Sequence, residues 1–165
     1  MVQASVEERV ESIVRSFDCV LVDFVLNPAG THHGGQLLVT VGAPIGQSVT
    51  AERCAQISRT LGDELESGGL DKSLGDSYTL EVGTPGLTRK LKTERELAYA
   101  VGRQVRALCR PSADNKGGEV VTGVLTGHGP QVYEIDTGKG VRSLAREAVK
   151  TIQLDLLAAP SGARR

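Results

Sequence analysis

The sequence predicts an α+β protein of two small domains, and three observations support this fold class. Apolar residues recur at helical spacing in two segments of the first half, whereas the second half alternates with a period of two. The charge balance also changes along the chain, from −4 over residues 1–92 (8 Lys/Arg, 12 Asp/Glu) to +3 over residues 93–165 (11 and 8). We expect an N-terminal domain over 1–92, a C-terminal domain over 93–157 and a disordered tail over 158–165.

The N-terminal region begins with the pattern of a capped amphipathic helix. Apolar residues recur at helical spacing from Val6 to Phe17, and Ser5 with Glu8 matches a capping box, which predicts a helix over residues 5–17. Two β-branched, apolar segments follow, separated by a Gly-rich loop at 27–35. We expect them to form a hairpin of strands over residues 19–26 and 36–42.

A second helix and a third strand complete this domain. Thr50 is the expected N-cap, and apolar residues from Cys54 to Leu65 line one helix face that ends near Gly68. Residues 78–82 alternate as a half-buried strand. The expected order is αββαβ, with two helices covering one face of a three-stranded sheet.

The C-terminal region predicts a small β-barrel after a short linking helix at residues 94–101. About five short strands separated by Gly-rich turns are typical of such a barrel. Gly123 lies inside one of them and is expected at a bend or bulge. The expected strands cover residues 103–110, 119–126, 131–136, 141–144 and 150–156.

Several function classes lack support in the sequence. Three widely spaced cysteines form no disulfide framework, no apolar run approaches the roughly 20 residues that span a bilayer, and the N-terminus is no signal peptide. These features predict a cytoplasmic protein. No motif of a phosphate-binding loop, a nucleophile elbow or a zinc protease is present, and His32-His33 lacks nearby metal ligands. We expect no catalytic residue, no cofactor and no metal.

Aromatic residues are few, and they argue against recognition of RNA by base stacking. There is no Trp, and Phe17, Phe24 and Tyr78 fall on apolar stripes of the predicted core. Proteins that stack single-stranded bases need exposed rings. Only Tyr99 and Tyr133 are candidates for surface rings.

The candidate binding site is a Pro-Gly turn followed by cations. Pro85 fixes φ and Gly86 allows positive φ, as a type II turn requires, and Leu87 follows just past the turn. Two interpretations remain open: a structural corner with a solvated charge run, or a preformed loop that offers amides and cations to a phosphate or acidic partner. The expected contact cations are Arg89, Lys90 and Lys92, with Arg106 and Arg142 from the barrel.

The residues of this turn resemble the ribosome maturation factor RimP family. The similarity runs from about Val6 to Leu156 and includes Thr84-Pro85-Gly86-Leu87 with Arg89, the segment Gly102-Arg103-Gln104-Val105, and Gly123-Val124-Leu125. The family motif usually reads Ser-Ser-Pro-Gly-Leu-Asp-Arg-Pro-Leu. Gly83 and Thr84 replace its serines here, Thr88 replaces the Asp, and Lys90 replaces the second Pro.

The resemblance implies an αβ domain followed by an SH3-like barrel. It also implies a non-enzymatic factor, expected to be monomeric, that binds the immature 30S small ribosomal subunit and assists its late assembly. The implied partners are the twelfth small-subunit ribosomal protein and 16S rRNA, with no membrane. An alternative is a protein–protein adaptor that binds a basic ribosomal protein through Glu119, Glu134 and Asp136 without RNA contact. An enzyme has no supporting constellation of residues.

Overall fold

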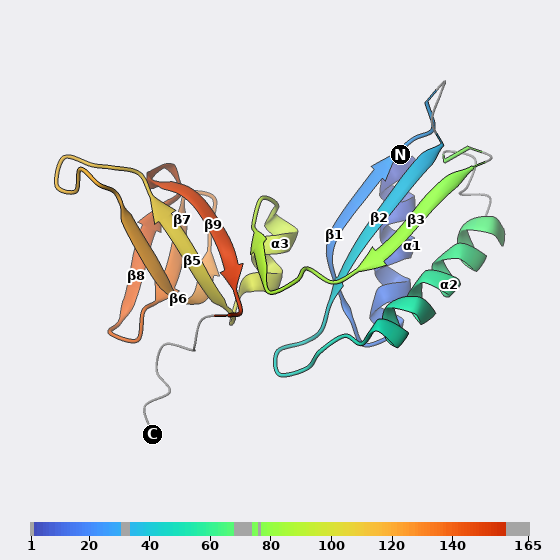
Figure 1. Ribbon diagram of the computed structural model, residues 1–165, viewed down its shortest axis with the longest axis horizontal. Coiled ribbons are helices and arrows are strands. Elements are labelled where there is room, and N and C mark those ends of the chain that lie inside the picture. Colours follow the sequence, from blue (N-terminus) through green and yellow to red (C-terminus); the bar gives the residue numbers. More distant parts are fainter. Residues whose placement is uncertain (1, 31–33, 68–73, 76, 158–165) are drawn as a thin grey trace. The chain divides into compact units, whose positions relative to one another are not determined.

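The computed structural model describes residues 2–30, 34–67, 74–75 and 77–157. The chain divides into two compact units, residues 1–85 and 86–165 (Figure 1). The expected tail at residues 158–165 and the expected helix end at Gly68 lie outside the described residues. Each unit contains its own sheet, and the two sheets share no strand.

The first unit has the predicted order αββαβ. Its sheet has the order β1-β2-β3, in which β1 pairs antiparallel and β3 parallel with β2. Core residues from both helices gather with residues of the sheet in one cluster, so the helices cover one sheet face (Figure 1). The elements are α1 (Val2–Ser16), β1 (Val20–Asn27), β2 (Gly35–Gly42), α2 (Ala51–Ser67) and β3 (Tyr78–Gly83).

The two helix starts differ in how well the sequence predicted them. Helix α1 begins at Val2, so Ser5 already lies inside the helix and the expected capping box with Glu8 is wrong. The cap of α2 is confirmed, because the amide of Arg53 donates to Oγ1 of Thr50 at 3.1 Å. Local polar residues fix a helix start only where the chain is not already helical before them.

The core of the first unit combines the helical period with the strand period. Each helix contributes residues spaced three or four apart, and β2 contributes alternate residues, all almost fully buried. The central members are Val6, Val10 and Val14 from α1, Ile57, Leu61 and Leu65 from α2, and Leu37, Val39 and Val41 from β2.

The second unit is built on one antiparallel sheet of six strands in the order β4-β9-β5-β6-β7-β8. Its core includes Val105, Leu125, Ile135 and Leu154, each fully buried. The predicted α+β class is therefore confirmed. The elements are β4 (Thr88–Lys90), α3 (Glu94–Ala100), β5 (Gln104–Cys109), β6 (Glu119–His128), β7 (Val132–Asp136), β8 (Val141–Ala145), η2 (Arg146–Ala148) and β9 (Val149–Asp155).

The structural division falls before Gly86, whereas the sequence placed the boundary after Lys92. The difference arises because Thr88–Lys90 forms β4 and pairs with β9, at the far end of the chain. Three residues are too few to show an alternating pattern. The shift transfers Arg89, Lys90 and Lys92 to the second unit.

Gly123 does not lie at a bulge, one of the two roles expected for it. The register of β6 against β7 shifts between Leu125 and Gly127, so the bulge lies further along the strand. At Gly123 the carbonyl oxygen of Asp136 would lie 2.2 Å from a Cβ atom. A glycine is needed there because the backbone of β7 approaches β6 closely.

Candidate functional site

The Pro-Gly linker has the backbone that the sequence predicts at its glycine. Pro85 ends the first unit and Gly86 begins the second, with φ 78° at Gly86. A Cβ at Gly86 would meet no atom closer than 3.9 Å, so the requirement for glycine is conformational rather than steric. Leu87 follows with 57% of its surface exposed, and its carbonyl accepts a hydrogen bond from the amide of Leu156 at 2.9 Å.

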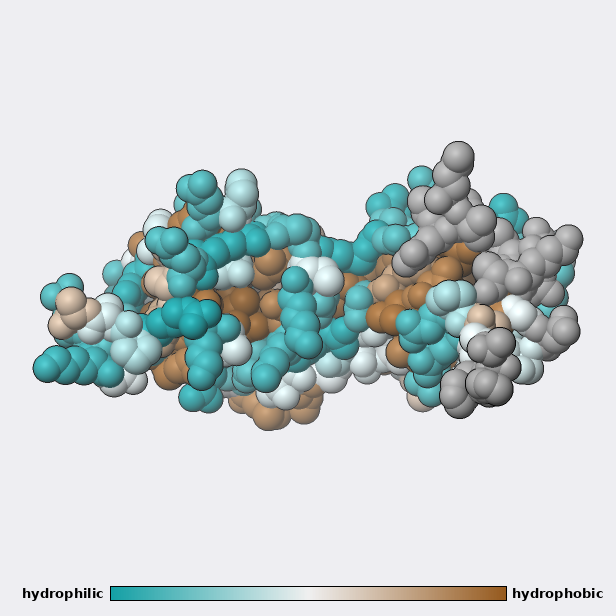
Figure 2. Space-filling view, turned by 90° about the horizontal axis from the view of Figure 1, so that it is seen from above, coloured by the Kyte–Doolittle hydropathy of each residue, from teal (hydrophilic) through white to brown (hydrophobic). Residues whose placement is uncertain are grey.

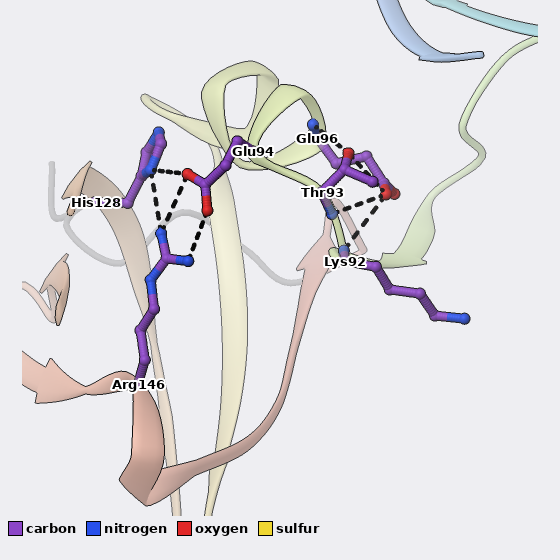
Figure 3. A network of polar contacts seen from close by, with 6 residues as sticks. All are labelled: Lys92, Thr93, Glu94, Glu96, His128 and Arg146. Carbon is purple, nitrogen blue, oxygen red and sulfur yellow. Dashed lines mark hydrogen bonds and ion pairs between the residues drawn. The ribbon is translucent and has the colours of Figure 1, made fainter. Parts of the chain in front are cut away.

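Arg89 is held inside the second unit by an ion pair. Its Nε donates to Oε2 of Glu96 at 2.8 Å, and Glu96 is only 3% exposed. The other carboxylate oxygen accepts from the amides of Lys92 and Thr93 at 3.4 and 3.3 Å (Figure 3). The amide of Glu96 donates to Oγ1 of Thr93 at 3.1 Å, which completes a capping box at the start of α3.

The three cations after the turn are therefore not equivalent. Arg89 lies opposite Leu154, a core residue of β9, so its side chain starts on the inner side of the sheet. Lys90 is the next residue along β4 and projects from the outer side, where it is exposed. Lys92 is also exposed, and its side chain points away from the Glu96 network (Figure 3).

Cross-strand pairing places Lys90 and Arg106 in the same row of the sheet, on either side of β9. Lys90 is opposite Gln153 of β9, Gln153 is opposite Arg106 of β5, and Arg106 is opposite Thr122 of β6. Directly paired residues point to the same sheet face, so these four side chains form one polar row, which we call the Lys90–Arg106 rung. Strands β4 and β5 are two strand spacings apart, roughly 10 Å.

An exposed apolar patch lies beside this rung. Leu108 pairs with Val120 one step further along β5 and β6, and their exposed fractions are 37% and 46%. A shallow hollow of about 190 Å³ is lined by these two residues together with Arg106 and Gln153. Its mixed lining suits a partner that presents both charge and apolar surface.

Arg142 is separate from the rung. It lies opposite Ile135, a core residue, on the edge strand β8, and it binds Glu119 through two contacts of 2.6 and 3.2 Å. The hydrogen bonds from Arg142 hold the pKa of Glu119 below its ordinary value and raise that of Arg142. Both side chains remain more than 40% exposed, so this is a surface ion pair of low energy.

Two further arginines are engaged with tyrosines. Tyr99 and Tyr133, expected as surface rings, are each only 9% exposed, which corrects that expectation. The guanidinium of Arg103 lies 3.9 Å from the ring centre of Tyr99, and that of Arg146 lies 4.8 Å from Tyr133. The arginines cover the ring faces, and bases therefore cannot stack there.

Arg146 belongs to a second polar network, which is also at the N-terminal end of α3. Its guanidinium donates to both oxygens of Glu94 at 2.7 and 3.3 Å, and Nδ1 of His128 lies 3.2 Å from Glu94 (Figure 3). These contacts hold the pKa of Glu94 below its ordinary value, mainly through the hydrogen bond from Arg146. His128, the last residue of β6, is thus part of this network.

The acids expected to bind a basic protein are largely used within the second unit. Glu119 is paired with Arg142, and Oδ1 of Asp136 accepts from the amide of Gly138 at 2.9 Å. Glu134 is exposed on β7. The acidic surplus of the chain lies elsewhere, because residues 1–85 hold 5 Lys/Arg against 12 Asp/Glu.

The structural boundary makes the charge asymmetry larger than the sequence indicated. The first unit has a balance of −7, and the second, with 14 Lys/Arg and 8 Asp/Glu, a balance of +6. On the face that Figure 2 shows, hydrophilic side chains cover much of each unit, and apolar patches lie among these side chains. Opposite charges on two units favour contacts with two kinds of partner surface.

Metal and membrane features can be stated only for the described part of the chain. Within it, no group of three or more His, Cys, Asp or Glu residues could hold a metal ion. His32 and His33 lie outside the described residues. Among the helices that are described, none is long and apolar enough to cross a membrane.

Glu96 and β4 are the parts of this site that sequence reasoning missed. The pattern Thr93-x-x-Glu96 before an apolar segment is a capping-box signature and could have marked the start of α3. No local pattern shows that the same carboxylate also binds Arg89. That contact exists only because β4 pairs with β9.

These features define an α+β protein of two oppositely charged units, with exposed cations on one sheet face of the second. Residues 9–88 match the family model of the RimP N-terminal domain. A ribosome maturation factor RimP of Synechococcus sp. (strain RCC307) is 31% identical over 119 residues, which cover 72% of this chain and 73% of that protein. The chain belongs to the ribosome maturation factor RimP family.

Proposed function

We propose that this protein binds the immature 30S small ribosomal subunit in the cytoplasm and assists its late assembly through binding alone, without catalysing a reaction. Its proposed partners are 16S rRNA and the twelfth small-subunit ribosomal protein, and it acts as a monomer. Membership of the family supports the role in ribosome maturation. The residues of this chain support a particular way of contacting the particle.

The observation that carries this proposal is the Lys90–Arg106 rung. Two exposed cations on one sheet face, in a unit with a balance of +6, suit contact with phosphate groups. Tyr99 and Tyr133 are covered by arginines. The second unit therefore contacts the phosphate backbone of the RNA rather than stacking on its bases. Lys92 and Leu87, close to Lys90 in the sequence, are also exposed.

Binding of this kind assists assembly by shifting an equilibrium. A factor that binds one RNA conformation more tightly than another favours the first by its difference in binding free energy. Release follows when the mature contacts exclude the factor. The proposal therefore requires higher affinity for immature than for mature subunits.

The test compares two double variants that remove the same charge. Lys90→Gln with Arg106→Gln removes the cations of the rung, and Arg110→Gln with Lys116→Gln removes one exposed Arg and one exposed Lys elsewhere in the unit. The first variant should bind immature subunits about tenfold more weakly. The slope of the logarithm of its binding constant against the logarithm of salt concentration should become shallower by about one to two, which corresponds to about one to two lost phosphate contacts. The control should change affinity by less than about twofold.

Sedimentation of each variant with purified immature and mature subunits, at several salt concentrations, measures these affinities. Circular dichroism confirms that each variant is folded. Equal binding by the wild type and both double variants would refute the assignment of the rung. Equal affinity of the wild type for immature and mature subunits would refute the proposed function itself.

A protein–protein adaptor is the second candidate, and the −7 balance of the first unit favours it. Such a surface attracts a basic ribosomal protein without any RNA. Titrating the full chain with a 16S rRNA fragment and, separately, with the purified ribosomal protein distinguishes the two. Salt-sensitive binding of the protein without binding of the RNA would select the adaptor.

A further inference from the structure

Strand β3 forms an edge of the sheet in the first unit. In the part of the sheet that the structure describes, β3 pairs with β2 on one side and with no strand on the other. Alternate backbone amides and carbonyls of an edge strand point outward, where an extended chain can pair with them. Thr79, Glu81 and Gly83 are exposed along β3, whereas Tyr78, Leu80 and Val82 are half-buried.

A groove lies between this strand and helix α2. It has a volume of about 750 Å³, and its lining includes Val49, Cys54, Ala55, Ser58, Leu80 and Val82. Leu80 and Val82 are opposite Leu37 and Val39 of β2, which are 0% and 2% exposed. Leu80 and Val82 stay only half-buried because no further strand covers them. The groove thus continues the core-facing side of the sheet outward, beyond β3.

The residues that α2 contributes to the groove are small. Ala51, Ala55 and Ser58 recur at helical spacing, with Cys54 beside them. Small side chains leave room beneath the helix for apolar side chains of an added segment. The same side of a strand presents every second residue, so such a segment needs alternate apolar residues.

The charges around the groove indicate the chemistry of the segment. Glu81 lines the groove from β3, and α2 carries four acids and two arginines. Two of these charges are engaged, because Arg53 donates to the backbone carbonyl of Phe17 at 2.8 Å and Glu64 pairs with Arg9 of α1. With a balance of −7 over the whole unit, the surroundings favour a cationic chain over an acidic one or a nucleic acid.

We propose that an extended segment of a partner protein, with apolar residues alternating with Lys or Arg, adds to the edge of β3 as a fourth strand. Its apolar side chains enter the groove beneath α2, and its cations lie on the side of Glu81. This contact is independent of the Lys90–Arg106 rung, which lies in the other unit. The added strand itself does not depend on the proposed function. If the proposed function holds, the partner protein is a ribosomal protein, and only that identification rests on it.

The test uses synthetic peptides and the full chain, without any ribosomal particle. A labelled peptide of alternating Lys and Val, as long as the 6 residues of β3, should bind in fluorescence anisotropy titrations. A peptide of alternating Glu and Val should bind at least about tenfold more weakly because of the acidic surroundings. Equal affinity for the two peptides would overturn the proposed chemistry.

Backbone pairing is tested on the peptide itself. Two Lys-Val peptides are N-methylated at alternate amides, one at the odd and one at the even positions. Only one set of amides faces β3 in a paired strand, so one peptide should lose about tenfold in affinity and the other about twofold or less. Equal effects of both methylation patterns would overturn the added strand.

Two variants locate the site on the protein. Ala55→Tyr fills the groove and should weaken the Lys-Val peptide about tenfold, whereas Gln56→Tyr places the same ring on an exposed residue outside the groove lining and should change affinity less than about twofold. Glu81→Lys should also weaken binding and reduce its salt dependence. If Ala55→Tyr fails to fold, Glu81→Lys and the methylated peptides still decide the question.

Two outcomes would exclude the proposed occupant. Unchanged peptide affinity in both Ala55→Tyr and Glu81→Lys would show that the peptide binds elsewhere. A wild-type dimer in sedimentation equilibrium that Ala55→Tyr converts to a monomer would assign the groove to a second copy of this chain. Neither outcome bears on the binding of subunits through the second unit, which is measured separately.

Discussion

The side chain of Arg89 lies 2.8 Å from the carboxylate of Glu96, which is almost completely buried in the second unit. This contact joins β4 to the first turn of α3. It converts the first cation after the Pro-Gly turn into a structural residue. Lys90, its neighbour, remains exposed on the opposite side of the sheet.

Replacing Arg89 by Ala should destabilise the second unit by about 2–4 kcal/mol, because the buried carboxylate of Glu96 loses its cation. Lys90→Ala on the same strand should stay within about 0.5 kcal/mol. Urea unfolding followed by circular dichroism, with hydrogen exchange of β4 and β9 amides to assign the loss to this unit, measures both. Equal stabilities of the two variants would contradict a structural role for Arg89.

Gly123→Ala should destabilise the second unit by about 1–3 kcal/mol, because the added Cβ would lie 2.2 Å from the carbonyl oxygen of Asp136. Gly117→Ala is the matched control, since the nearest atom to its Cβ would be 4.0 Å away. Thermal unfolding of the two variants compares them directly. A Gly123→Ala protein as stable as Gly117→Ala would mean that β7 moves away from β6 without cost.

Gly86→Ala should weaken the hydrogen bond between the Leu156 amide and the Leu87 carbonyl by roughly 1–2 kcal/mol, because φ 78° at residue 86 is unfavourable for a residue with a Cβ. The readout is hydrogen exchange of the Leu156 amide, which donates to the carbonyl of the neighbouring Leu87. Exchange should accelerate in this variant. Gly83→Ala, where a Cβ meets nothing within 4 Å and φ is not positive, should leave it unchanged.

Acid should destabilise the second unit partly through Glu94 and Glu119. Their arginine partners lower the pKa of both carboxyls from an ordinary value of 4.5. A carboxyl with a lower pKa in the folded state stabilises the fold above its ordinary pKa, and this contribution is lost as pH falls through the lowered value. Melting temperatures between neutral pH and about pH 3 should therefore fall less steeply in Glu94→Gln with Glu119→Gln than in the wild type.

Both carboxyl groups are well exposed, so the difference should be small and should shrink at high salt. Glu134→Gln, an exposed acid on β7, provides the control for removing a charge. The same steepness in the double variant and the wild type would show that these ion pairs make no net contribution.

Local patterns were sufficient to predict most of the elements. Helix α2 and its cap at Thr50, the order αββαβ and five of the six strands of the second unit follow from the spacing of apolar residues and from turn residues. These signals are local because a helix repeats every 3.6 residues and a strand every two. A bulge is harder to read: the register shift between Leu21 and Asp23 places Leu21 in the core, although strict alternation would group it with exposed Val25.

The candidate site was only partly visible in the sequence. The Pro-Gly turn and the run of cations could be found, and the positive φ of Gly86 follows from its residue type. The sequence did not show that Arg89 forms a structural ion pair whereas Lys90 and Lys92 are exposed. It depends on which sheet face each residue occupies and on Glu96, whose second contact is with a residue on another element.

The amino-acid order alone determined the helices, the longer strands, the flexible-backbone glycine at the turn and the contrast in charge between the two halves. Tertiary structure decided that Arg89 is half-buried and paired with a buried acid, that Lys90 and Arg106 share one row, and that the tyrosines lie beneath arginines. The reason is physical: periodicity and capping are written in the local sequence, whereas strand pairing and contacts between side chains of different elements depend on how those elements pack.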